Sequence, residues 1–211
     1  MKLGEGIIAL GLKLPVGAED KLAAYLALLA KWNKVYNLTS IRDPGEMVTH
    51  HMLDSLAVLP VLQKSALAGR HASLADVGSG AGLPGLVLAI ACPDWEVTSV
   101  EAVEKKTAFQ RQAKIELGLA NVSIHCGRVE DLEGNYDAVI SRAFASLADY
   151  IGYAGQLSDC LWAMKGAYPA DEIAALPDGW RIAEHHGLRV PGLLAERCLL
   201  KLEKGQACMP S

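Results

Sequence analysis

A short glycine-rich segment constrains the fold of this chain more than any other feature. The segment "LADVGSGAGLPG", residues 74–85, runs from apolar, strand-like residues into closely spaced glycines. A glycine turn between a strand and a helix lets the backbone approach a ligand that side chains would otherwise exclude. The glycines fit two patterns: G-x-G-x-x-G from Gly80 to Gly85, typical of dinucleotide sites, and D-x-G-x-G-x-G from Asp76 to Gly82, typical of S-adenosylmethionine sites. Both patterns predict a strand, a ligand-binding turn and a helix.

Short apolar segments alternate with helical segments along the rest of the chain. The pattern predicts strands at 73–77, 95–101, 121–126, 136–142 and 161–166. It predicts helices at 85–92, 104–118 and 146–157. This alternation predicts an α/β fold: a doubly wound, Rossmann-like, mostly parallel sheet with helices on both faces. The segments "GWRIAEHHGLRV" and "ERCLLKLEK" have no helix between them, so an antiparallel strand pair is expected at the C-terminal end.

The first part of the chain is expected to form a helical extension, residues 1–70, ahead of a domain at 71–211. Apolar residues at helical spacing predict a helix over 19–33. The "DPGE" segment supplies an N-cap at Asp43 and a proline at the first helical position. A second helix is therefore expected from there to about Val58, before the next proline.

Composition limits the class of protein. A length of 211 residues allows one domain, or one domain with an extension. The cysteines are far apart and form no C-x-x-C pair, which argues against a zinc ribbon or a disulfide framework and indicates a reducing cytosol. The N-terminal segment is too short and too often charged for a signal peptide or a membrane span. A net charge of −4 counts against a nucleic-acid binder unless the positive charge is concentrated on one face.

Residues around the glycines favour S-adenosylmethionine over a dinucleotide. Asp76 ends the strand before the loop, where it can order the loop near a zwitterionic amino-acid group. Pro84 removes a backbone N–H donor that a pyrophosphate would use. Glu101 ends the next strand about twenty residues later, where a carboxylate typically holds ribose hydroxyls. Val129 and Glu130 follow the third strand and are placed to cover the adenine and read its amino edge. The alternative is that the glycines only make a tight turn.

The "SRAF" segment, Ser141 to Phe144, follows the expected fourth strand and carries the candidates for the methyl-acceptor site. It lacks the Asn/Asp-Pro-Pro-aromatic run of enzymes that methylate amino groups of bases, and it lacks the cysteine nucleophile of pyrimidine C5 enzymes. Arg142 is a poor base but a good hydrogen-bond donor, and Phe144 can stack on a base. This suits an acceptor that already carries a free lone pair, such as guanine N7. The alternatives are an ion pair that closes the loop for Arg142 and core packing for Phe144.

Basic residues that should share one rim of the sheet are the candidate contacts to RNA. With Phe144, they are Lys31, Lys34, Arg42, Lys105, Lys106 and Lys165. A solvated helix face is the alternative. His50, His51 and Asp54 fall within one helical turn, but no further ligands have a suitable spacing, so no metal site is expected. An internal His–Asp pair or an RNA contact is expected there instead.

Several separate motifs together resemble the ribosomal RNA small subunit methyltransferase G family, also called glucose-inhibited division protein B. In chain order they are "KWNKVYNLTSIRDPGEMVTHHMLDSL", "DVGSGAGLPGLVLAI", "SRAFASL" and "KG….DEI". The resemblance covers most of the chain. It implies a bacterial cytosolic enzyme that transfers a methyl group from S-adenosylmethionine to N7 of one guanosine in 16S ribosomal RNA.

The resemblance also implies site residues. The expected cofactor contacts are Gly78, Leu83, Val129, Glu130 and Arg142, to which the loop pattern adds Asp76, Gly80, Gly82 and Glu101. Arg142 is the expected catalytic residue, acting through orientation, because N7 alkylation releases no proton and needs no general base. Two positions depart from the family pattern: Glu101 stands where Asp is common, and Cys198 stands where His is expected.

Three other functions stay open at this point. A small-molecule methyltransferase would keep the same loop but needs a closed pocket, which the helical extension could form. An NAD(P)-dependent oxidoreductase would need a proton donor near the nicotinamide, and no Y-x-x-x-K stands where it would serve. A non-catalytic RNA-binding module would not need the cofactor. The expected partner is 16S ribosomal RNA in the small subunit, with a monomeric, cytoplasmic protein that binds neither membrane nor metal.

Overall fold

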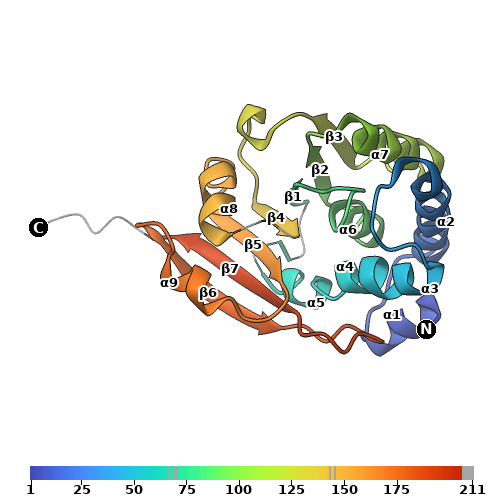
Figure 1. Ribbon diagram of the computed structural model, residues 1–211, viewed down its shortest axis with the longest axis horizontal. Coiled ribbons are helices and arrows are strands. Elements are labelled where there is room, and N and C mark those ends of the chain that lie inside the picture. Colours follow the sequence, from blue (N-terminus) through green and yellow to red (C-terminus); the bar gives the residue numbers. More distant parts are fainter. Residues whose placement is uncertain (66, 69–70, 143, 145, 206–211) are drawn as a thin grey trace, which may run out of the picture.

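The computed structural model describes residues 1–65, 67–68, 71–142, 144 and 146–205. The predicted boundary at residue 70, Ala143 of the "SRAF" segment and Cys208 lie outside the described residues. The fold is built on one seven-stranded sheet with the order β3-β2-β1-β4-β5-β7-β6 (Figure 1). The strands are β1 (Ser73–Val77), β2 (Glu96–Glu101), β3 (Val122–Cys126), β4 (Ala138–Arg142), β5 (Cys160–Lys165), β6 (Trp180–Gly187) and β7 (Cys198–Lys204).

Pairing within the sheet confirms the predicted topology. Strands β1 to β5 pair in parallel with their neighbours, whereas β7 runs antiparallel to both β5 and β6. The chain order reverses between β1 and β4, so the carboxyl ends of these two strands form the crevice where open α/β sheets bind ligands. The sheet is therefore Rossmann-like, with the glycine loop at that crevice.

Helices cover both faces of the sheet, because strand side chains alternate between two cores. Leu74 of β1 belongs to one core, while its neighbour Ala75 belongs to the other. The first core contains α2 (Ala18–Tyr36), α6 (Gly85–Ala91) and α7 (Glu104–Leu117). The second contains α8 (Leu147–Ala154). All four helices were predicted from the sequence.

The N-terminal helices share a core with the sheet. Leu22 and Tyr25 of α2 are fully buried in the same apolar cluster as Leu86 of α6 and Phe109 of α7. The rings of Tyr25 and Phe109 lie 5.8 Å apart. The extension is thus packed against helices α6 and α7 on one face of the sheet, and its division from the rest of the chain near residue 70 stays a prediction.

The segment after Asp43 is helical as predicted, but it is not one uniform α-helix. Asp43 caps α3 (Pro44–Met47) by accepting a hydrogen bond from the Glu46 N–H at 2.9 Å. A π-helix (Val48–Leu53) follows, and π-helices are rare and frequent at functional sites. The chain continues through α4 (Asp54–Leu56) and α5 (Leu59–Leu62). Pro60 lies in the first turn of α5, where a missing N–H costs nothing, so it starts a helix rather than ending one.

Several short helices were not predicted, among them α1 (Leu3–Ala9), α9 (Ala170–Ala174) and the 3-10 helix η2 (Val129–Asp131). Helices of one or two turns carry only a weak apolar periodicity. Among the described residues, no helix is both long and apolar enough to cross a bilayer. The described cysteines, Cys92, Cys126, Cys160 and Cys198, are free thiols.

Candidate functional site

The glycine loop between β1 and α6 has a backbone that glycine accepts readily and other residues do not. Gly78, Gly80 and Gly82 have φ angles of 67°, 59° and 89°. The side chain of Glu101 fixes the loop from the end of β2. Its Oε2 accepts a hydrogen bond from the Gly80 N–H at 2.9 Å, and its Oε1 accepts one from the Val103 N–H at 2.9 Å. Glu101, predicted as the ribose ligand, therefore also orders the loop.

Two helices brace the same loop through residues that the sequence did not single out. Gln110 of α7 donates hydrogen bonds from Nε2 to the Ser79 hydroxyl at 2.9 Å and to the Gly80 carbonyl at 2.8 Å. The Tyr25 hydroxyl of α2 donates to the Ala81 carbonyl. Gln110 and Tyr25 are fully buried. A polar group at a buried helix position needs a partner, and this is the signal that could have found both residues.

Asp76 lies beneath the loop rather than on its surface. Its side chain is 0% exposed, and its Oδ2 accepts a hydrogen bond from the Gly85 N–H at 2.7 Å. Its Oδ1 has no partner among the described residues. Burial raises the pKa of this carboxyl from an ordinary 3.8 to about 7, although the Gly85 N–H and the charge of Arg142 oppose the rise. Asp76 thus ties β1 to the start of α6.

Replacing Asp76 with asparagine is expected to change how stability depends on pH. Below about pH 4 Asp76 is protonated in both the folded and the unfolded protein. Between about pH 4 and 7 only the folded protein keeps this proton, so folding stability falls as the pH rises. Above pH 7 the cost is constant and on the order of 4 kcal/mol. The neutral amide keeps an acceptor for the Gly85 N–H and avoids this cost. Urea unfolding of the cofactor-free protein at pH 4 to 8 measures the difference between the two proteins, which should be near zero at pH 4 and grow toward pH 7.

The difference in stability between the Asp76→Asn protein and its parent is the informative quantity. His51 titrates in the same pH interval and has the opposite effect on the pH dependence of stability. Burial, followed by the charge of Arg142, lowers the pKa of His51 to about 4. Its stabilising contribution is therefore lost as pH falls from about 6.5 to 4. His51 is present in both proteins, so its contribution cancels. An Asp76→Asn protein with the pH profile of the unsubstituted protein would show that Asp76 is charged when folded.

A cavity of about 240 Å³ opens beside the loop, at the carboxyl ends of β1 and β2. Its lining includes Gly78, Glu101, Arg128, Val129, Glu130, Phe144 and Tyr153. The predicted cofactor contacts Gly78, Glu101, Val129 and Glu130 are thus brought together. The lining combines carboxylates, which can accept hydrogen bonds from hydroxyl and amino groups, with apolar side chains. This combination fits an adenosine that bears a positive sulfonium. The remaining predicted contacts, Asp76, Gly80, Gly82, Leu83 and Arg142, do not line this cavity, and Arg142 lines another one described below.

Phe144 belongs to the wall of the first cavity. Its ring centroid lies 5.4 Å from that of Tyr150 and 6.0 Å from that of Tyr153. A Cβ added at Gly78 would lie 3.5 Å from the ring, so the glycine and the ring are neighbours. The structure therefore places Phe144 beside the candidate cofactor cavity, and its predicted contact with RNA stays a prediction.

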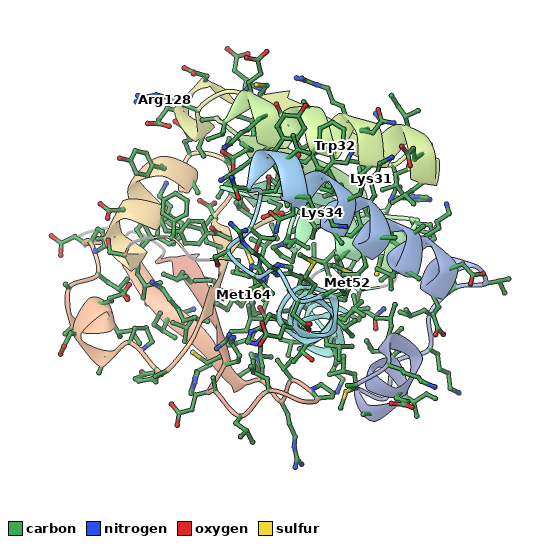
Figure 2. All side chains as sticks on the ribbon, turned by 45° about the vertical axis from the view of Figure 1, so that its right-hand side comes forward. Lys31, Trp32, Lys34, Met52, Arg128 and Met164 are labelled. Atoms are coloured by element: carbon green, nitrogen blue, oxygen red, sulfur yellow. The ribbon has the colours of Figure 1, made fainter. Side chains whose placement is uncertain are left out.

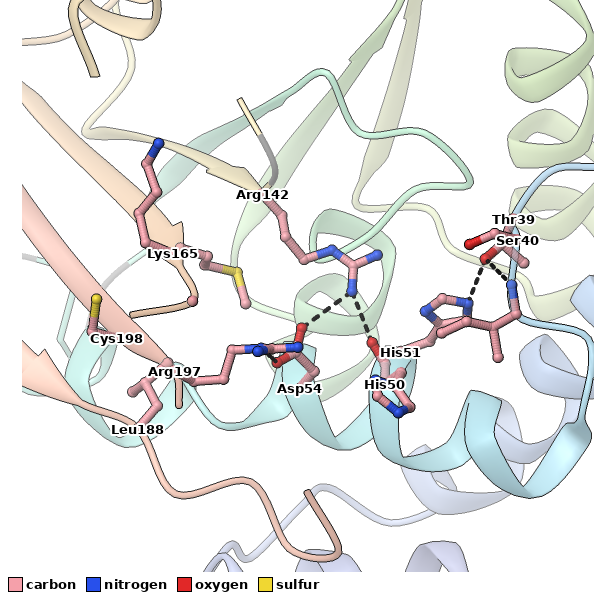
Figure 3. Close-up of a pocket in the computed structure, with 13 residues that line it drawn as sticks. Thr39, Ser40, His50, His51, Asp54, Arg142, Lys165, Leu188, Arg197 and Cys198 are labelled. Carbon is pink, nitrogen blue, oxygen red and sulfur yellow. Dashed lines mark hydrogen bonds and ion pairs between the residues drawn. The ribbon is translucent and has the colours of Figure 1, made fainter. Parts of the chain in front are cut away.

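Arg142 lines a second cavity, of about 450 Å³, between the end of β4 and the π-helix (Figure 3). Its Nη1 donates hydrogen bonds to the His50 carbonyl at 2.9 Å and to Asp54 Oδ2 at 3.2 Å. The Nε of Arg197 donates to Asp54 Oδ1 at 2.9 Å from the other side. The ion pair considered for Arg142 is therefore present, and its partner lies in the helical extension. Neither the pairing nor Arg197 was predicted.

The cluster of His50, His51 and Asp54 does not form the expected His–Asp pair. Asp54 bonds to the two arginines instead, and His51 Nε2 lies 2.9 Å from the Thr39 hydroxyl. The π-helix distributes these side chains around the axis differently from an α-helix, which the spacing in the sequence could not reveal. Within the described ranges, no group of three or more His, Cys, Asp or Glu side chains could hold a metal ion.

The basic residues proposed to contact RNA divide into free and engaged groups. Lys31 and Lys34 of α2 are exposed (Figure 2), as are Lys105 and Arg42, although Nη2 of Arg42 donates a hydrogen bond to Asn37 Oδ1 at 3.1 Å. Helix α2 packs against α7, so these lysines lie on neighbouring elements. Lys106 pairs with Glu101 at 3.5 Å. Lys165 lines the second cavity, but it is 12% exposed and pairs with Glu172 at 2.7 Å. Glu172 belongs to the "DEI" motif, which explains why that motif accompanies Lys165.

Comparison with known proteins identifies relatives of this chain by sequence. The family model for rRNA small subunit methyltransferase G matches residues 18–200. A protein named ribosomal RNA small subunit methyltransferase G from Aromatoleum aromaticum is 54% identical over 211 residues, which cover 96% of this chain and 97% of that protein. One of the same name from Burkholderia thailandensis is 50% identical over 214 residues, covering 97% of this chain and 91% of that protein.

Solved structures support the fold alone, because their sequences are distant. TrmN from Thermus thermophilus matches with a TM-score of 0.58 and 18% identity, covering 74% of this chain and 53% of that one. A mutant of MtNAS in complex with S-adenosylmethionine matches with a TM-score of 0.58 and 15% identity, covering 89% of this chain and 76% of that one. The sequence matches carry the assignment: this chain belongs to the rRNA small subunit methyltransferase G family.

Proposed function

We propose that this protein transfers a methyl group from S-adenosylmethionine to N7 of a guanosine in 16S ribosomal RNA of the small subunit. The observation that carries the proposal is the position of the two cavities. Phe144 lines the first and Arg142 lines the second, and Lys165 of the second cavity donates a hydrogen bond to the Phe144 carbonyl at 3.4 Å, so the two cavities are neighbours. A cofactor in the first and a base in the second would meet at the end of β4, where open sheets bind ligands.

The residues of the first cavity have binding and positioning roles in this proposal. S-adenosylmethionine supplies an activated methyl group on a positively charged sulfur. Glu101 holds the ribose hydroxyls, while Val129 and Glu130 contact the adenine. Gly78 lets the backbone approach the cofactor, and the remaining loop residues, with Asp76 below them, keep this backbone in place.

The residues of the second cavity orient the acceptor. Guanine N7 already carries a lone pair, so no side chain has to remove a proton, and alignment supplies most of the rate. At the end of β4, Arg142 has guanidinium N–H groups that can donate hydrogen bonds to the base. Its hydrogen bonds to the His50 carbonyl and to Asp54 fix its position. The exposed Lys31, Lys34, Arg42 and Lys105 extend the contact to the surrounding RNA backbone.

Mapping of N7-methylguanosine in 16S ribosomal RNA tests the proposal. Cells without the gene should lack one modified guanosine, and the purified protein with S-adenosylmethionine should restore it on their small subunits. Activity on a metabolite with none on ribosomal RNA would favour the small-molecule methyltransferase instead. Naked RNA and assembled subunits are compared in the same assay.

Ligand-induced thermal stabilisation separates the remaining alternatives. S-adenosylhomocysteine should raise the unfolding temperature and NADH should not, because a ligand stabilises only the protein that binds it. Stabilisation by NADH would support an oxidoreductase, and RNA affinity without any cofactor effect would support a binding module. We further propose a monomeric, cytoplasmic enzyme without a metal; size-exclusion chromatography and activity in the presence of EDTA test the first and last of these.

A further inference from the structure

The second cavity contains an arrangement of charges that the roles above do not explain. Asp54 is 3% exposed, and its carboxylate is held between Arg142, at the end of β4, and Arg197, immediately before β7. Figure 3 shows the two guanidinium groups approaching this carboxylate from opposite sides. One carboxylate thus orients two arginines that lie far apart in the sequence.

Both arginines keep donors that the described part of the chain does not use. Arg197 donates a hydrogen bond from Nε to Asp54 at 2.9 Å and one from Nη1 to the Glu196 carbonyl at 2.8 Å. Arg142 donates hydrogen bonds only from Nη1, to Asp54 and to the His50 carbonyl. Nη2 of Arg197, and Nε and Nη2 of Arg142, therefore have no partner among the described residues. Both side chains are 24% exposed, so these donors are accessible.

The charges that line the cavity leave an excess of positive charge. Asp54 offsets one of its two arginines, and Glu172 offsets Lys165 at 2.7 Å. The pKa of His51 is lowered to about 4, mainly by burial, so its ring is neutral at pH 7. One formal positive charge remains. A partly buried guanidinium with free N–H groups suits a phosphate, to which it can donate a charge-assisted hydrogen bond.

We propose that this cavity receives the acceptor nucleotide and that Arg197 binds its phosphate group, while Asp54 is the positioning residue for both arginines. The inference rests on the proposed function and adds a substrate-binding residue to it. A volume of about 450 Å³ falls within the range of pockets that enclose small ligands. Enzymes that act on one base commonly take it out of the stack into such a pocket. Arg142 then faces the base and Arg197 faces the backbone that carries it.

Position in the fold supports this division of roles. Cys198 pairs with Lys165 across β7 and β5, so Arg197 stands next to the carboxyl end of β5. In the sheet order, β4 lies between β5 and β1, the strand that leads into the glycine loop. Along this edge of the sheet the first cavity therefore lies at the ends of β1 and β2, Arg142 lies at the end of β4, and Arg197 lies beside the end of β5. A nucleotide placed in that order has its base nearest the cofactor and its phosphate outermost.

Methylation kinetics with small ribosomal subunits that lack the modification test the proposal. Arg197→Ala should raise KM for subunits at least ~10-fold, because a charge-assisted hydrogen bond is lost. It should also reduce the slope of log(kcat/KM) against log[salt] by about 0.7, the value for one phosphate contact to single-stranded RNA. The affinity for S-adenosylhomocysteine should not change, which also verifies that the variant is folded.

Three further variants distinguish a phosphate contact from a structural role. Arg197→Lys keeps the charge and should retain the salt slope while recovering part of KM. Asp54→Asn also keeps both positive charges, so it should raise KM with an unchanged salt slope. Arg181→Ala is the matched control, since Arg181 is an arginine of the same hairpin whose side chain is 64% exposed and pairs with Glu203. It should leave KM and the salt slope unchanged.

The outcomes separate the inference from the function on which it rests. Unchanged KM and salt slope in Arg197→Ala, with normal methylation by the parent enzyme, would overturn the phosphate contact and leave the proposed function intact. A raised KM with an unchanged salt slope in Arg197→Ala would also overturn it, because the arginine would then act only by packing. Failure of the parent enzyme to methylate small subunits would overturn both.

Discussion

Replacing Arg142 with alanine is expected to lower kcat for methylation of small ribosomal subunits about 100-fold. This corresponds to about 3 kcal/mol, which is the upper range for hydrogen bonds made by a charged group. In the proposed mechanism no residue moves a proton, so the alignment of N7 with the methyl group supplies the rate. Arg142 lines the second cavity, and Phe144, two residues later in the chain, lines the first. Transfer of a labelled methyl group from S-adenosylmethionine at saturating subunit concentration measures kcat directly.

The loss should come from alignment rather than from unfolding. Asp54 would keep Arg197 as a partner at 2.9 Å, so the variant would not leave a buried carboxylate unpaired. The unfolding temperature and the affinity for S-adenosylhomocysteine should therefore stay close to those of the parent. Arg142→Lys is an informative companion, because an ammonium group cannot bond to His50, Asp54 and a base in one plane. Normal turnover of Arg142→Ala on small subunits would exclude the proposed role.

Replacing Gly85 with alanine is expected to destabilise the protein by about 3 kcal/mol, and to abolish cofactor binding. A Cβ at this position would lie 2.7 Å from Oδ2 and 2.8 Å from Cβ of Asp76, both too close for real contacts. Asp76 is fully buried and bonded to the Gly85 N–H, so it cannot move without displacing the loop above it. For a protein of this size the unfolding temperature should fall by about 10 °C.

Gly152→Ala provides the control for this substitution. Gly152 lies within α8 and an added Cβ meets nothing within 4 Å. Alanine there should raise stability by up to about 1 kcal/mol, because it lowers the entropy of the unfolded chain and favours the helix. Calorimetry of both variants, with and without S-adenosylhomocysteine, gives the comparison. Equal stability of Gly85→Ala and the parent would mean that the loop does not depend on the contact between Gly85 and Asp76.

Much of the fold could be predicted from the sequence, since local periodicity reports which side of an element is buried. The strands and the helices α2, α6, α7 and α8 were placed within a few residues, and the C-terminal antiparallel pair followed from the absence of a helix between two strands. The elements that escaped prediction are short, such as α1 and α9, or irregular, such as the π-helix. Their patterns are too brief to establish a period.

The candidate cofactor site was also largely visible in the sequence, because its residues lie in or directly after consecutive strands. Parallel strands end at the same edge of a sheet, so Gly78, Glu101 and Val129 had to meet there. The sequence did not predict which of the site residues form hydrogen bonds to the loop backbone. Asp76 turned out to lie under the loop, and Glu101 turned out to bond to Gly80.

The sequence by itself determined the fold class, the cofactor loop and the family, because each depends on neighbouring residues or on motifs in a fixed order. Only the tertiary structure showed the second cavity, in which Asp54 joins Arg142 and Arg197. Asp54 and Arg142 are 88 residues apart, and Asp54 and Arg197 are 143 apart. Periodicity indicates that a polar residue is buried but not which distant partner satisfies it. That choice follows from how the fold brings Asp54 of the helical extension to Arg142, at the end of β4, and to Arg197, immediately before β7.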